Sequence, residues 1–241
     1  MGRLEAYDKA LDYSYAPGVF PATECLKNAP GRCLRLLLSS QSEGSEGAAR
    51  LREAAQAAGV RVEIADRALE RISRKENCFA AMVYRKQEGV FDQAAPHIVL
   101  HHPSDSGNMG TILRTADAAG FDGVLLSSGC ADLYGAKTLR ATMGSVFRVP
   151  TRRTDDLAGE LMAMRAQGYA IAATELGGED FYTGCPRGKC VLVIGSEGRG
   201  VSQAVRSAAT HHLALPMRGG AESLNAAVAA GIMIYEMARE R

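Results

Sequence analysis

Short apolar segments alternate with helical patterns from His97 to the end of the chain, and this alternation most constrains the fold. Apolar segments expected to form strands lie at 97–102, 123–128, 146–150, 169–176, 190–195 and 211–217. Helical patterns lie at 107–120, 136–144, 154–168 and 221–241, with Thr154 as the expected N-cap of the third. Strands this apolar, connected by helices, are typical of a mainly parallel sheet covered on both faces. Ligands of such sheets bind beyond the carboxyl ends of the strands.

Residues 1–95 contain a shorter α/β pattern of their own. Strands are expected at 33–40, 60–65 and 79–85, and helices at 48–59 and 68–73. Gly59 is expected to close the first of these helices, because glycine readily adopts the left-handed conformation found at helix ends. The segment 86–96 is polar, ends near a proline and is interpreted as a linker. The chain is therefore predicted to form two domains, residues 1–95 and 96–241.

Charge and composition exclude several classes of protein. The 241 residues carry a formal net charge of +1, which is not the strongly basic balance of a non-specific nucleic-acid binder. Any RNA contact must come from a local cluster such as Arg71, Arg74 and Lys75, which otherwise forms a solvated helix end. The longest apolar stretches are far shorter than the ~18 residues that a membrane span needs. The N-terminus lacks the apolar core of a signal peptide. We therefore expect a cytoplasmic protein with no membrane segment.

Neither the cysteines nor the histidines predict a metal site. None of the six cysteines belongs to a CxxC pair, so reduced thiols are expected. Adjacent histidines at 101–102 and 211–212 lie in strand-like segments, where neighbouring side chains point to opposite faces. Structural roles are therefore expected for both histidine pairs.

A glycine-rich loop follows the strand expected at 190–195. In "VLVIGSEGRGVS" (191–202) an apolar run leads into Gly195, and Glu197 lies among the glycines. Glycine loops after strands usually bind phosphate, but a carboxylate at the centre of the loop would repel one. The GxGxxG fingerprint of dinucleotide-binding enzymes is absent from the loop before 107–120, which disfavours a dehydrogenase. The glycine loop therefore predicts a ligand without phosphate.

Two further loops each lead into a helix. Asn108 lies at the start of the first helix, and Arg114 follows one to two turns later, either in a buried ion pair or facing a ligand. In the other loop, Glu222 or Ser223 could cap the final helix, and Asn225 is expected inside its first turn. The small residues that follow Asn225 would let another backbone approach that helix closely.

The three loops resemble, in order and spacing, the three motifs of the SpoU branch of the SPOUT methyltransferases. The matching segments are "GNMGTILRTADAAGFDGVLL", "VLVIGSEGRGVS" and "LPMRGGAESLNAAVAAGIMIYE", and the resemblance covers residues 97–240. It implies a parallel-sheet domain with a deep C-terminal trefoil knot, which is rare among proteins. It also implies a homodimer, S-adenosylmethionine bound in a bent form at the knot, and methyl transfer to a ribose 2′-hydroxyl of RNA.

The resemblance also implies roles for individual residues. The implied catalytic residues are Arg114, Asn108, Glu197, Ser223 and Asn225, and the implied cofactor contacts are Thr174, Gly195, Glu197, Leu215, Met217, Ser223 and Leu224. The family proposal makes Arg114 a base, but a guanidinium is almost never neutral in proteins. We therefore interpret Arg114 as a cation that binds phosphate and stabilises the developing alkoxide. Glu197 would orient Arg114, Asn108 would orient the ribose, and Ser223 and Asn225 would organise the third loop.

The first region resembles, more weakly, the small α/β RNA-binding domain that many SpoU enzymes carry, which is like a ribosomal protein. "YSYAPGVFPATECLKNAPGRCLRLLLSS" and "VEIADRALERISRKENCFA" fit that pattern, although "APGVFPATECL" replaces its usual Phe-x-x-Glu-Gly run. Large-subunit ribosomal RNA is therefore the favoured substrate. Transfer RNA is an alternative with the same chemistry, and a non-catalytic RNA-binding module is a third possibility. The homodimer interface is expected to include the final helix and residues 135–145.

Overall fold

The computed structural model describes residues 4–73, 78–92, 94–196 and 198–239, and the chain folds into two compact units. The first unit comprises residues 1–87 together with 132–148, and the second comprises 88–131 together with 149–241. The units differ from the two expected domains in one respect besides the exact boundary. The segment 132–148 packs with the first unit, although the chain enters it from the second and returns there afterwards.

The first unit contains a four-stranded mixed sheet with the order β1-β4-β2-β3. Its elements are β1 (Tyr13–Pro17), α1 (Val19–Asn28), β2 (Cys33–Leu38), α2 (Glu46–Ala57), β3 (Arg61–Ile64), α3 (Asp66–Ser73), β4 (Ala80–Arg85) and α5 (Ala136–Thr142), with 3-10 turns at Pro30–Arg32, Ser40–Ser42 and Ser145–Phe147. Strands β2 and β3 are parallel, and β4 runs antiparallel to both β1 and β2. The sheet, α2, α3 and the left-handed Gly59 (φ 70°) were predicted, whereas β1 and α1 were not.

Residues 132–148 join the first unit through aromatic packing and hydrogen bonds. The ring of Phe147 lies edge-on to the buried ring of Tyr84, with 5.1 Å between the centroids. The hydroxyl of Ser14 donates to the carbonyl of Tyr134 at 2.9 Å. The strand predicted at 146–150 is wrong: the chain forms a 3-10 turn there, because this apolar run packs on Tyr84 instead of pairing in a sheet.

The second unit contains a six-stranded sheet in which all adjacent strands are parallel, which confirms the predicted parallel sheet. The strands are β5 (His97–Leu100), β6 (Gly123–Ser127), β7 (Thr151–Thr154), β8 (Ala170–Asp180), β9 (Cys190–Ile194) and β10 (His211–Ala214), in the order β10-β8-β9-β5-β6-β7. The helices are α4 (Ser106–Ala118), α6 (Leu157–Ala166), α7 (Phe181–Gly184), α8 (Gln203–Ala208) and α9 (Ala226–Ala238).

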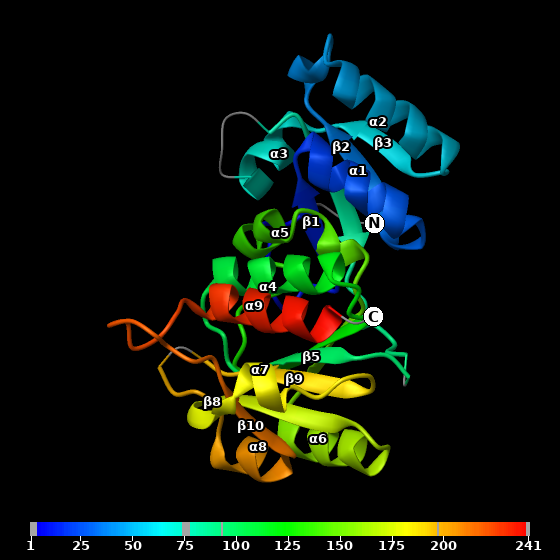
Figure 1. Ribbon diagram of the computed structural model, residues 1–241. Helices are drawn as coiled ribbons and strands as arrows, with labels where there is room; N and C mark the ends of the chain where they lie inside the picture. Colours follow the sequence, from blue (N-terminus) through cyan, green and yellow to red (C-terminus); the bar gives the residue numbers. More distant parts are fainter. Residues whose placement is uncertain (1–3, 74–77, 93, 197, 240–241) are drawn as a thin grey trace. The chain divides into compact units, whose positions relative to one another are not determined.

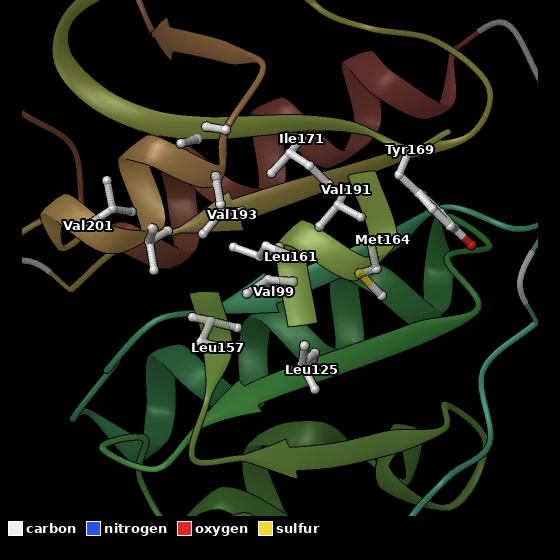
Figure 2. Close-up of a cluster of buried hydrophobic side chains, with 14 residues drawn as sticks. Val99, Leu125, Leu157, Leu161, Met164, Tyr169, Ile171, Val191, Val193 and Val201 are labelled. Atoms are coloured by element: carbon white, nitrogen blue, oxygen red, sulfur yellow. The ribbon is translucent and has the colours of Figure 1, made fainter. Parts of the chain in front are cut away.

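Helices cover both faces of this second sheet. On one face, side chains of α6 and α8 such as Leu161 and Val205 pack on strand residues that include Val99, Val191 and Val193 (Figure 2). On the other face, α4 and α9 lie side by side (Figure 1). The methyl group of Thr115 lies 4.0 Å from the position that a Cβ on Gly231 would occupy, so small residues do bring these two helices close together.

Two helix starts differ from the predicted ones. Thr154 is the last residue of β7, and Asp156 caps α6 instead, because its carboxylate accepts from the backbone N–H of Gly159. Asn225 is the N-cap of α9 and not a first-turn residue, since its side-chain oxygen accepts from the N–H of Ala227 at 2.9 Å. Across the described residues, no helix combines the length and apolar character required to cross a membrane.

Candidate cofactor and active site

A cavity of about 500 Å³ opens in the second unit, where β9 and β10 end and β8 leaves the sheet. Its walls come from β8 and β10, from the loops after β9 and β10, and from residues of α8 and α9. Six residues expected from the family resemblance to contact a cofactor line this cavity: Thr174, Gly195, Leu215, Met217, Ser223 and Leu224. The seventh, Glu197, lies outside the described residues. Three loops separated in sequence therefore converge on one cavity.

The loop after β9 folds back on itself, and Gly195 makes this possible. Ser196 and Gly200 exchange backbone hydrogen bonds, of which the N–H of Gly200 makes the shorter at 2.9 Å. A Cβ on Gly195 would lie 2.5 Å from the carbonyl carbon of Gly200 and 2.7 Å from its oxygen. The space that a side chain at Gly195 would occupy is therefore already filled by the loop itself.

Strand β8 has an interruption that shapes the opposite wall of the cavity. His212 of β10 pairs with Ala173, but the next residue, Leu213, pairs with Glu179, so the pairing skips residues 174–178. A Cβ on Gly178 would lie 2.6 Å from the carbonyl oxygen of His212. The skipped residues therefore leave the ladder, and Thr174 becomes available to the cavity.

Two residues implied as catalytic meet at the starts of α4 and α9. The side-chain amide of Asn225 donates to the Oδ1 atom of Asn108 at 3.0 Å. Each helix start is capped, α9 by Asn225 itself and α4 by Asp105, whose carboxylate accepts from the N–H of Asn108 at 2.8 Å. Capping fixes both backbones, so the amide pair is held in a defined place.

Arg114 is exposed on α4, so the alternative of a buried ion pair is wrong. It follows Asn108 by six residues, which corresponds to about 9 Å along a helix axis. Within the part of the chain that the structure describes, its guanidinium makes no ion pair and no hydrogen bond. Its expected partner, Glu197, lies outside that part. The exposed guanidinium is therefore open to an anionic ligand on this side of the helix.

The charges at the cavity are balanced among the described residues that line it. Glu175 and Glu222 are acidic, whereas Arg199 and Arg206 are basic. A phosphate-binding site would carry an excess of positive charge or a cradle of free N–H groups. The balance therefore fits the prediction of a ligand that carries no phosphate.

The histidine pair at 101–102 differs from its prediction. His102 lies beyond the end of β5 with φ 61°, and its ring packs against that of His101 at 4.2 Å between centroids. The expectation that the two rings point to opposite faces is therefore wrong for this pair. Burial, followed by the neighbouring His102, lowers the pKa of His101 to about 4, so its imidazole is neutral near pH 7. Among the residues described, no group of three or more His, Cys, Asp or Glu side chains could hold a metal ion.

Two charged residues at the cavity, Glu175 and Arg206, were missed by the sequence reasoning. Glu175 is the last residue but one of the segment 169–176, which was expected to be a regular strand. The signal was the adjacent pair Gly177-Gly178, because glycines inside a strand often mark a bulge. Arg206 lies on α8, a short helix that was not predicted.

The basic cluster at the end of α3 is described only in part. Arg71 is an exposed residue of this helix, and Arg74 and Lys75 lie outside the described residues. Its role in RNA binding stays a prediction.

Comparison with known proteins shows the family to which the second unit corresponds. Residues 95–235 match the model of the SpoU rRNA Methylase family. The chain belongs to this family. The matched segment includes β5, both helix starts and every loop of the cavity. The predicted resemblance to the SpoU branch is thereby confirmed.

One relative matches the chain by sequence, and two solved structures match it by fold. The 23S rRNA (guanosine(2553)-2′-O)-methyltransferase RlmP of Bacillus subtilis is 41% identical over 134 residues, which are 55% of this chain and 54% of that protein. The chain thus aligns with only about half the length of this relative. The SpoU methyltransferase AviRb from Streptomyces viridochromogenes, in complex with the cofactor AdoMet, is 28% identical with a TM-score of 0.81, over 95% of this chain and 90% of that one. An AdoMet-bound rRNA methyltransferase from Sinorhizobium meliloti is also 28% identical, with a TM-score of 0.80 over 95% and 87% of the chains.

Proposed function

We propose that this protein is an S-adenosylmethionine-dependent methyltransferase that modifies a ribose 2′-hydroxyl of RNA. The observation that carries the proposal is the convergence of six implied cofactor contacts on one cavity in the second unit. The name of the Bacillus subtilis relative includes ribose 2′-O-methylation, and two structural relatives are described with AdoMet. An RNA-binding module without activity is disfavoured, because Asn108, Arg114, Ser223 and Asn225 are all present.

The cavity fits the cofactor in size and in charge. Small-molecule sites commonly have volumes of ~300–1,000 Å³, and the cavity of about 500 Å³ lies in this range. Its balanced charges suit a nucleoside that carries a sulfonium and no phosphate. Leu215, Met217 and Leu224 would contact the adenosine moiety, with the backbone of the loop after β9 opposite them. We also propose that the chain around this cavity forms the deep trefoil knot that the family resemblance implies.

The implied catalytic residues would prepare the RNA for reaction. When bound, S-adenosylmethionine supplies a methyl group that is already activated. The remaining task is to orient the ribose hydroxyl and to stabilise the negative charge that develops as it loses its proton. Arg114 is the fixed cation for this charge, and Glu197 orients it. Asn108 orients the ribose, while Ser223 and Asn225 organise the loop that leads into α9.

Ribosomal RNA of the large subunit is the proposed substrate. One relative is named as a 23S rRNA enzyme, and the Sinorhizobium meliloti rRNA enzyme aligns over 95% of this chain. That coverage includes most of the first unit, to which we assign RNA binding. Transfer RNA remains the alternative substrate. Either RNA would be modified in the cytoplasm.

Calorimetry with the purified protein tests the cofactor. S-adenosylmethionine and its demethylated product are expected to bind with micromolar dissociation constants, or about −8 kcal/mol. NAD and ATP are expected to bind far more weakly, because their phosphates would enter a cavity with no excess positive charge. A comparison of ribose methylation in RNA from a deletion strain and its parent identifies the substrate. Tight ATP binding with no response to either sulfur compound would contradict the proposal.

The protein is proposed to be a homodimer whose interface includes α9. Val228, Ile232 and Tyr235 recur at helical spacing on this helix, and their exposed fractions are 52%, 37% and 55%. Tyr182, Met217 and Leu224 line a small hollow with Ile232, which extends the apolar surface. An exposed apolar patch of this kind is typical of an interface. The segment 135–145 stays a predicted part of it.

Light scattering checks the assembly, and a substitution locates the interface. The wild-type protein is expected to have the mass of a dimer at micromolar concentration. Ile232→Lys should shift it toward monomer, because a lysine ammonium would be buried without a partner. Met162→Lys on α6 is the control, since Met162 is 63% exposed on the opposite face of the sheet. A wild-type monomer, or equal dissociation by both variants, would contradict the proposed interface.

A further inference from the structure

The carboxylate of Glu175 is held at the wall of the cavity by Arg206. Glu175 belongs to the segment of β8 that leaves the sheet, and its side chain is only 14% exposed. The Nε atom of Arg206 lies 2.9 Å from Oε2 of Glu175, and Nη2 donates to Oε1 at 3.3 Å. Both residues line the cavity. The ion pair, with one hydrogen bond to Oε1 and a close approach to Oε2, holds the carboxylate in position.

The carboxylate of Glu175 can accept further hydrogen bonds in this position. Two carboxylate oxygens offer about four acceptor positions, and the arginine N–H bond to Oε1 occupies one of them. Oε2 is buried and lies 2.9 Å from Nε of Arg206 and 3.4 Å from Nδ1 of His212, but among the described residues neither contact forms a hydrogen bond. A buried acceptor without a donor is costly, so a donor supplied by a ligand would stabilise this arrangement.

We propose that Glu175 accepts hydrogen bonds from the ribose hydroxyls of the bound adenosine moiety, and that Arg206 is the positioning residue that fixes its carboxylate. The inference rests on the proposed function, since it assigns part of that cofactor to one wall of the same cavity. A ribose presents two neighbouring hydroxyl donors, and an acidic side chain is the usual protein partner of such hydroxyls in nucleotide sites. Glu175 lies next to Thr174, which is itself an implied cofactor contact.

Binding of ribose-modified ligands tests the assignment. Calorimetry measures the affinity of S-adenosylhomocysteine and of its 2′-deoxy and 3′-deoxy analogues for wild-type protein and for Glu175→Gln. The substitution is expected to weaken S-adenosylhomocysteine about tenfold or more, because it removes a charge-assisted hydrogen bond. At least one deoxy analogue should lose a similar factor with wild type. The two losses should not add, because each removes the same interaction.

Matched variants separate binding from folding. Glu160 on α6 forms the same kind of ion pair with Arg152, with N–O distances of 2.6 and 2.8 Å, and it does not line the cavity. Glu160→Gln should therefore leave all three affinities unchanged. Arg206→Gln should weaken S-adenosylhomocysteine by a smaller factor than Glu175→Gln, since the carboxylate remains but is no longer held. Melting temperatures of all variants report any loss of fold.

Each remaining outcome overturns the assignment. If wild type binds both deoxy analogues as tightly as S-adenosylhomocysteine, the protein does not recognise the ribose hydroxyls. This conclusion holds whatever affinity Glu175→Gln shows. If the losses are additive, the carboxylate acts on another part of the ligand. If wild type binds no sulfur nucleoside, the cofactor of the proposed function fails as well. If wild type binds S-adenosylhomocysteine and Glu175→Gln binds it equally tightly, only the present assignment is overturned and the proposed cofactor stands.

Discussion

Replacement of Arg114 by alanine is expected to lower the rate of methyl transfer by about 100-fold or more and to leave cofactor affinity unchanged. The guanidinium is exposed on α4 and is not among the residues that line the cavity. Loss of the side chain should therefore affect the RNA side of the reaction only. The measurement is transfer of labelled methyl groups to RNA from a deletion strain, together with calorimetry of the cofactor.

Arg114→Lys distinguishes a fixed cation from a base. Lysine keeps the charge but lacks the planar fork that binds two phosphate oxygens together. If Arg114 is a two-pronged cation, the lysine variant should be nearly as slow as alanine from pH 6 to 10. If Arg114 is a base, the lysine variant should keep activity that rises steeply with pH. Arg165→Ala, an exposed arginine on α6, is the matched control and should keep wild-type rates. Full activity of Arg114→Ala would remove Arg114 from the mechanism.

Gly195→Ala is expected to weaken cofactor binding by about 100-fold, which corresponds to about 3 kcal/mol. The added Cβ would lie 2.5 Å from the carbonyl carbon of Gly200, and backbone cannot rotate away as a side chain can. The hydrogen bonds between Ser196 and Gly200 would then break, and the wall of the cavity would change shape. Calorimetry with S-adenosylhomocysteine measures the loss.

A second glycine of the same loop provides the control. Gly198 also lines the cavity, but a Cβ built on it would meet no atom within 4 Å. Gly198→Ala should therefore keep an affinity close to that of wild type. Equal effects of the two substitutions would indicate that loop flexibility, and not the close approach of Gly200, explains the role of glycine here.

The sheet of the second unit could be predicted because most of its strands are buried on both faces. Their apolar sequences, such as "VLVI" before Gly195, separate them clearly from the helices. Strand β7 could not be found in this way. It lies at the edge of the sheet, so its Arg152 and Arg153 remain partly solvated and the pattern is polar. The neighbouring apolar run 146–150 gave the stronger strand pattern, although the core of the first unit buries its Phe147.

The residues of the candidate site that lie in the three motifs could be predicted from the sequence. Those whose positions depend on the pairing register of two strands could not. Asn108 and Asn225 lie in two motifs 117 residues apart, and the structure joins their amides. The position of Glu175 depends on a skipped stretch of pairing between β8 and β10, at which Gly178 approaches the carbonyl of His212 closely. Local sequence does not specify such a long-range contact.

The allocation of residues 132–148 to the first unit affects how the chain can be divided. A fragment that starts at residue 96, the boundary suggested by the sequence pattern, would still contain this segment. It would lack Tyr84, on which Phe147 packs, and the hydroxyl of Ser14 that bonds to Tyr134. Leu139 and Phe147, both buried in the whole chain, would then be exposed to solvent and would favour aggregation. An autonomous fragment of the second unit therefore requires excision of this insertion and a short bridge between residues 131 and 149.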